Sequence, residues 1–260
     1  MIIEKGNNRS VQASSIDFGN IGIDEITSEA EHLLNNIAEA SESKGLFTVK
    51  TADRWIEQAK TRPIPKMLFG EFWFEGELCI LFADSNVGKS ILAVQIGDSI
   101  SKGSHIAGFK LEAPRQSIIY FDFELSDKQF ETRYSKEFKE HYSFSSNFFR
   151  AEINADDSTL HGFSCFEDYL NDSLEKAVVE TGAKVLIIDN LTYLRTENEK
   201  AKDALPLMKN LKGLKNKYGL SIMALAHTPK RDFSKPITGN DLQGSKMLMN
   251  FCDSAFSIGQ

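Results

Sequence analysis

The sequence predicts an α/β fold, a mostly parallel β-sheet with helices on both faces. From residue 78 onward, short apolar segments of the kind buried in parallel sheets alternate with longer segments of helical period. The first apolar segment leads directly into a Gly-Lys-Ser sequence at 88–90 and then into a helix. Three later apolar segments reach polar residues, Glu124, Asp189 and His227. Because the carboxyl ends of parallel strands share one edge of a sheet, we expect these residues to face a common crevice.

The composition limits the class of protein. The chain has 260 residues with 41% hydrophobic content, enough for one sizeable α/β domain. No apolar segment approaches the roughly 18–20 residues of a membrane span, and the N-terminus does not read as a signal peptide. The three cysteines lie far apart, without metal-ligand spacing. We therefore expect a cytoplasmic protein without a membrane partner.

Three parts are expected along the chain. Residues 1–22 are polar and show no sustained period, which is typical of a flexible tail. Residues 23–65 predict a helical N-terminal arm and linker, with an amphipathic helix over 24–40, a capped helix over 51–59 and a stiff Pro-containing linker over 62–65. Residues 66–260 predict the α/β domain. The sequence stops soon after the last predicted strand, which leaves open that a C-terminal segment is missing.

Residues 83–90, called the phosphate loop below, follow the first predicted strand. Strand, loop and helix with Gly-Lys-Ser at the joint is the arrangement of a phosphate-binding loop, so we expect ATP and Mg²⁺ as cofactors. Gly88 lets backbone N–H groups approach phosphate oxygens, and Lys89 reaches the β and γ phosphates. The Ser90 hydroxyl is a candidate Mg²⁺ ligand. Ala83 stands where the motif has its first glycine, which is allowed if its φ is negative. The expected nucleotide-binding residues here are Asp84, Ser85, Asn86, Val87, Gly88, Lys89, Ser90 and Ile91.

After the phosphate loop, the chain alternates as βα units do. We expect strands over 117–124, 147–153, 184–189, 221–227 and 253–258, and helices over 126–138, 166–181 and 203–218. Ser126 and Gln129 have the spacing of a capping box at the start of the first of these helices.

Two predicted strands end in carboxylates with distinct expected roles. Asp189, at the end of a buried strand, suits the Walker B role of holding Mg²⁺ largely through ordered water. A carboxylate near the γ-phosphate but off the metal could polarise the attacking water. Glu124 and Asp122 share one side of their strand, and only the position of Glu124 nearer the strand end favours it. From its position alone, His227 could equally be a functional residue or a histidine whose hydrogen bonds are satisfied at the end of its strand.

The chain resembles RecA-type ATPases, and within them the RepA and DnaB group of hexameric replicative helicases. The similarity covers about residues 50 to 260, and it is carried by residues 83–90, 120–126, 186–190, 225–228 and 242–246, together with Arg133 on the predicted helix. The resemblance implies a RecA-like ATPase domain over 66–260, with Glu124 as the catalytic glutamate. It also implies His227 as the γ-phosphate sensor and adds Arg133 and Lys246 to the nucleotide-binding residues.

One residue departs from this family. RepA-like proteins carry an arginine finger just before the Gly-Ser pair of the last motif, where this chain has Gln243. The available cations are Lys230, Arg231, Lys235 and Lys246. Three of them are called the finger candidates below; in order of preference they are Lys246, Arg231 and Lys230.

The resemblance implies a homo-oligomeric ring, a hexamer, that couples ATP hydrolysis to movement along single-stranded DNA. The family's DNA-contacting loops correspond to about 193–202 and 230–244. The net charge of −7 argues against nucleic-acid binding by bulk electrostatics, although a few basic loops facing a threaded strand remain compatible with it. The alternative is a non-motor regulatory ATPase whose nucleotide state controls a protein partner. A small-molecule kinase is disfavoured because no arginine-rich lid is present.

Overall fold

The computed structural model describes residues 47–154, 162–191, 204–229, 232, 235–242 and 245–259. The chain divides into two compact units, Met1–Pro63 and Ile64–Gln260. The described part of the first unit contains α2 (Ala52–Lys60), which Thr51 caps by accepting a hydrogen bond from the Arg54 N–H. This is the capped helix predicted over 51–59. The tail predicted over 1–22 and the helix predicted over 24–40 lie outside the described residues.

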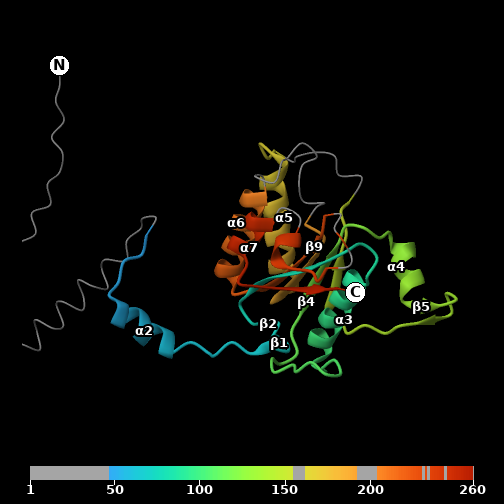
Figure 1. Ribbon diagram of the computed structural model, residues 1–260, viewed down its shortest axis with the longest axis horizontal. Coiled ribbons are helices and arrows are strands. Elements are labelled where there is room, and N and C mark those ends of the chain that lie inside the picture. Colours follow the sequence, from blue (N-terminus) through green and yellow to red (C-terminus); the bar gives the residue numbers. More distant parts are fainter. Residues whose placement is uncertain are drawn as a thin grey trace, which may run out of the picture. The chain divides into compact units, whose positions relative to one another are not determined.

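The second unit is built on a parallel β-sheet (Figure 1). Its strands, in chain order, are β3 (Leu78–Ala83), β4 (Ile118–Asp122), β7 (Phe148–Ala151), β8 (Val185–Asp189), β9 (Ser221–His227) and β10 (Ser254–Ile258). Their spatial order is β10-β3-β9-β8-β4-β7, and every neighbouring pair is parallel. Strands β3, β4 and β8 are buried along their whole length, which explains why they appear in the sequence as unbroken apolar segments.

Helices cover both faces of this sheet (Figure 1). One face carries α3 (Lys89–Lys102), and the small hairpin of β1 (Met67–Phe69) and β2 (Trp73–Phe74) joins the same buried cluster. The other face carries α5 (Phe166–Thr181), α6 (Ala204–Tyr218) and α7 (Ser245–Phe251). Alternate residues of each strand enter the two clusters; on β3, for example, Ile80 faces one and Leu81 the other. The second unit thus has two apolar layers, one on each face of the sheet.

The helix predicted over 126–138 is wrong in its second half. Helix α4 (Asp127–Arg133) begins at the predicted capping box but ends five residues early. A short hairpin follows, formed by β5 (Ser135–Lys136) and β6 (Glu140–His141). Its turn places Glu137 and Phe138 at φ of 52° and 57°, which no α-helix allows. The hairpin β1–β2 was not predicted, because its strands are only three and two residues long.

The register of the sheet aligns the strand ends that carry polar residues. Asp122 of β4 lies opposite Asp189 of β8, and Ala83 of β3 lies opposite His227 of β9. Strand β9 lies between β3 and β8, so the phosphate-loop strand and the Asp189 strand are not neighbours. A parallel sheet in this order, with helices on both faces, is the RecA-like P-loop α/β fold that the resemblance implied. Within the described residues, no helix is long and apolar enough to cross a bilayer.

Candidate nucleotide site

The phosphate loop joins β3 to the N-terminus of α3. Gly88 is the N-cap of α3 with φ of 93°, and Asn86 has φ of 64°, a conformation that asparagine tolerates better than most residues. A Cβ built on Gly88 would meet no atom within 4 Å, so open space adjoins the first turn of the helix. Ala83 ends β3 and is not among the residues of positive φ, which is the condition for alanine at this place. The loop therefore offers backbone N–H groups and a helix N-terminus to an anion.

Lys89 is the buried cation of the site. It is 5% exposed, and the structure gives its ammonium group no hydrogen bond or ion pair with any described side chain. Burial lowers its pKa from the usual lysine value, while Asp189 and Glu124 nearby act in the opposite direction. A buried ammonium group without a protein anion in contact is costly unless a ligand supplies the negative charge. The phosphates of a nucleotide would meet that need.

Asp189 is held at one oxygen and free at the other. The Tyr120 hydroxyl donates a hydrogen bond of 2.6 Å to Asp189 Oδ2, and both residues are 1% exposed. Burial, and then the negative charge of Asp189, raise the pKa of Tyr120 far above its usual value, so the phenol stays a donor. Asp189 Oδ1 is buried and has no hydrogen-bond partner among the described residues. An unsatisfied buried carboxylate oxygen at the end of this strand fits a group that coordinates Mg²⁺ or its water.

The two carboxylates of the β4 end have different surroundings. Asp122 is 2% exposed and accepts hydrogen bonds from the N–H groups of Glu124 (3.2 Å) and Leu125 (3.0 Å), and it forms an ion pair with Arg150 at 2.9 Å. Every oxygen of Asp122 is thus committed inside the protein. Glu124 is about one-third exposed, and its carboxylate points to the polar residues of β8 and β9. Of these two carboxylates, it is that of Glu124 that faces the site.

Asn190 connects Glu124 with His227. Its Nδ2 donates a hydrogen bond to Glu124 Oε1 and lies 3.2 Å from His227 Nε2. His227 Nε2 is itself 3.8 Å from Glu124 Oε1. Burial, and then the charge of Lys89, lower the pKa of His227 below 6.5, although Glu124 and Asp189 oppose this. The imidazole is therefore neutral near pH 7, and the predicted water-polarising and sensor residues lie side by side.

The end of β9 is fastened to the phosphate loop. Thr228 Oγ1 donates a hydrogen bond to the buried carboxylate of Asp84, and the Thr228 N–H donates to the Ala83 carbonyl over 3.1 Å. The carboxylate of Asp84 is thus engaged with the protein, so its part in nucleotide binding falls to its backbone. A displacement of the residues after β9 would therefore shift the phosphate loop as well, because a buried hydrogen bond joins the two.

The residues present fit a bound Mg²⁺ that is shared with a nucleotide. Ser90 lies in the first turn of α3, and Asp189 supplies the unsatisfied oxygen. Among the described residues there is no group of three or more His, Cys, Asp or Glu side chains that could enclose a metal without other ligands. Mg²⁺ commonly takes one or two protein oxygens and completes its shell with phosphates and water, so few protein ligands are needed.

Not all predicted residues join this cluster. Ser85 and Ile91 are exposed on the loop and the first turn of α3, and Val87 is half-buried between them. Arg133 is exposed at the end of α4, where it lines a hollow with the β5–β6 hairpin. Lys246 lies in α7, but its side chain is outside the described part of the chain, as are Arg231, Lys230, Gln243 and the loop 193–202.

Three residues that shape the site were not assigned a role from the sequence: Tyr120, Asn190 and Arg150. Asn190 directly follows Asp189, and this adjacency was the one available signal. Tyr120 sits inside an apolar strand, where an aromatic residue is ordinarily part of the core. Arg150 follows Asp122 by 28 residues, and no sequence motif links the two positions.

Comparisons with known proteins relate the chain to one family. A family model described as an AAA domain (AAA_25) matches residues 43–232. No curated protein matches the chain. Among solved structures, the crystal structure of the KaiC-like protein PH0186 from the hyperthermophilic archaeon Pyrococcus horikoshii OT3 is similar, with a TM-score of 0.47 and 15% identity over 74% of this chain and 75% of that one. Since the family model spans well over half of the sequence, the chain belongs to the AAA domain family and is a P-loop ATPase of RecA-like fold.

Proposed function

We propose that the protein hydrolyses ATP with Mg²⁺, and that Glu124 orients and polarises the attacking water. The observation that carries this proposal is the cluster of Glu124, Asn190 and His227 beside a buried lysine that no described acidic side chain contacts. Glu124 accepts a hydrogen bond from the Asn190 amide at Oε1, and no described residue donates to its other oxygen. Such a group can accept a hydrogen bond from water.

Each residue then has one task in binding or hydrolysis. Backbone N–H groups of the phosphate loop and the Lys89 ammonium bind phosphate oxygens. Ser90 and Asp189 would hold Mg²⁺, which when bound neutralises charge on the β and γ phosphates. His227, neutral at pH 7, can exchange hydrogen bonds with the γ-phosphate on one side and Asn190 on the other, as the sensor role requires.

A comparison of two substitutions tests the role of Glu124. We expect Glu124→Gln to bind MgATP with unchanged affinity and to hydrolyse it about 10²–10⁴-fold more slowly, because an amide cannot polarise water. Asp122→Asn is the comparison. It removes the charge of a buried carboxylate that faces the protein, and we expect it to slow hydrolysis less, because it can displace Glu124 but does not replace it. Binding is measured with a fluorescent ATP analogue, and hydrolysis by single turnover. A larger loss in Asp122→Asn would exchange the two roles.

We further propose that the subunits form a homo-oligomeric ring, a hexamer, and that hydrolysis is coupled to single-stranded DNA. This part is supported by the resemblance to RepA-like helicases and by the order of the motifs along the chain. In such a ring the site lies between subunits, and one of the finger candidates would reach the phosphates of the neighbouring subunit. The strongly acidic net charge of −7 favours instead a regulator that acts on a protein.

The ATPase rate with and without single-stranded DNA, across a range of salt concentrations, separates the two. A motor is expected to be stimulated several-fold, with a stimulation that declines as salt rises, because DNA binding releases counterions. An unchanged rate at low salt would support the regulatory ATPase. Sedimentation with and without MgATP tests the ring: a chain that stays monomeric in both would contradict it.

A further inference from the structure

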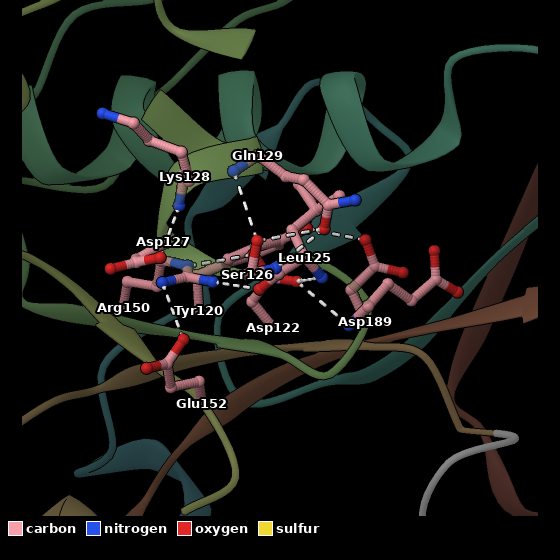
Figure 2. A network of polar contacts seen from close by, with 11 residues as sticks. Tyr120, Asp122, Leu125, Ser126, Asp127, Lys128, Gln129, Arg150, Glu152 and Asp189 are labelled. Carbon is pink, nitrogen blue, oxygen red and sulfur yellow. Dashed lines mark hydrogen bonds and ion pairs between the residues drawn. The ribbon is translucent and has the colours of Figure 1, made fainter. Parts of the chain in front are cut away.

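Arg150, which the proposed reaction does not use, belongs to the polar network in Figure 2, where it lies beside Glu152 and Asp122. Its side chain extends from the edge strand β7 and is 18% exposed. Nε donates to Asp122 Oδ2 over 2.9 Å, Nη2 donates to the Leu125 carbonyl, and Nη1 donates to Glu152 Oε2 over 3.1 Å. The guanidinium carbon also lies 4.8 Å from the centre of the Phe130 ring in α4. One side chain therefore joins β7, the end of β4 and the following helix.

These contacts lie on both sides of Glu124. Asp122 precedes it and Leu125 follows it, and Arg150 binds the side chain of the first and the carbonyl of the second. Asp122 in turn accepts hydrogen bonds from the N–H groups of Glu124 and Leu125. The backbone that carries Glu124 is thus held by a closed set of hydrogen bonds, and Arg150 donates two of them.

We propose that Arg150 is a positioning residue: it sets the place of the Glu124 carboxylate through Asp122 and the β4–α4 turn. This inference rests on the proposed ATP hydrolysis. The planar guanidinium matters because it donates to a carboxylate and to a carbonyl at the same time. The compact ammonium group of a lysine does not reproduce this geometry. Asp122 is buried, so it needs a paired cation, and Arg150 is its ion-pair partner among the described residues.

Arg150→Lys tests this with Glu152→Gln as the matched control. Lysine keeps a positive charge beside Asp122 but cannot also donate to the Leu125 carbonyl with the geometry of a guanidinium. We therefore expect the β4–α4 turn to become less ordered while the fold persists. We expect MgATP affinity within about twofold and single-turnover hydrolysis slower by about 10- to 100-fold, since small misplacements of a reacting group have effects of that size. Glu152→Gln removes an ion pair from the same arginine, but Glu152 is 54% exposed, and hydrolysis should stay unchanged.

The decisive measurement combines Arg150→Lys with Glu124→Gln. If Arg150 acts through Glu124, then Arg150→Lys should slow the residual hydrolysis of the Glu124→Gln protein by no more than about twofold. Equal losses in both backgrounds would mean a general structural role and would overturn the inference, while leaving the proposed function intact. A Glu124→Gln protein as fast as the unchanged one would overturn both, and that result is visible before Arg150 is altered. If Arg150→Lys does not fold, Asp122→Asn replaces it in the same cycle, with the same expectation of non-additivity.

Discussion

Removing the Tyr120 hydroxyl should cost the protein a measurable part of its stability in the absence of nucleotide. In Tyr120→Phe the ring keeps its packing, including the contact with Phe148 at 6.2 Å between ring centres, so no cavity forms. Asp189, however, loses the donor to Oδ2 and already has none at Oδ1. A buried carboxylate would then have two unsatisfied oxygens.

The magnitude follows from the kind of bond. A hydrogen bond to a charged group contributes about 1.5–3 kcal/mol, and both partners here are almost fully buried, so we expect a loss of about 2 kcal/mol. At a urea dependence of about 2 kcal/mol per molar, the unfolding midpoint of the second unit would fall by about 1 M. Because the raised pKa of Tyr120 keeps its phenol protonated, the difference from the unchanged protein should not vary between about pH 7 and 9.

Tyr142→Phe is the control for this experiment. Tyr142 also donates to a carboxylate, that of Asp98, but Tyr142 is 52% exposed and the Lys102 ammonium remains 2.9 Å from the same oxygen. Its loss should stay below about 1 kcal/mol. Equal losses for the two substitutions would refute the argument. The argument would also be refuted if Tyr120→Phe lowered the stability by the same amount in a protein that carries Asp189→Leu, because the hydroxyl has no carboxylate acceptor there.

Other changes have equally definite outcomes. Lys89→Ala should abolish productive ATP binding; a variant with unchanged affinity and turnover would remove the phosphate-loop assignment. His227 has a lowered pKa in the folded protein, so its contribution to stability should be complete above about pH 6.5 and decline as the pH falls from there toward the folded value. His227→Asn should remove that part of the slope in urea unfolding measured from pH 5 to 8. Replacing the true one among the finger candidates by Ala should lower turnover with little effect on ATP affinity, and mixing those subunits with Glu124→Gln subunits should restore some activity. No rescue at any mixing ratio would contradict a finger supplied by the neighbour.

The sequence predicts most of the fold because the signals are local. Buried parallel strands such as β3 and β8 consist of unbroken apolar residues, and α5 begins and ends where its periodicity and Gly182 place it. The end of α4 was missed because it depends on packing at a distance. Tyr134 and Phe130 pack against Phe144, with ring centres 5.2 and 5.8 Å apart, and the chain turns there into a hairpin.

The residues of the site likewise divide into those that local sequence patterns predict and those that depend on contacts distant in the sequence. The phosphate loop, Asp189 and His227 are strand-end residues, and the parallel register alone brings them to one edge of the sheet. The period of the strand does not separate Asp122 from Glu124, and among the residues themselves only the position of Glu124 nearer the strand end favoured it. Arg150 makes that choice: by pairing with the first carboxylate, it leaves the second to face β8 and β9. Such a partner, 28 residues away, is invisible to any pattern of spacing.

The pairing of buried charges explains why this edge of the sheet suits a phosphate chemistry. Asp84 is satisfied by Thr228, Asp122 by Arg150, and one oxygen of Asp189 by Tyr120. Each of these groups is closed to a ligand, because a satisfied buried polar group gains little by exchanging its partner. Among the described buried charges of this edge, the ammonium of Lys89 and Asp189 Oδ1 stay open, one cation and one anionic oxygen. An anion alone would meet the first and a cation alone the second. A nucleotide phosphate carrying Mg²⁺ meets both at once, so the site is complementary to the complex rather than to either component.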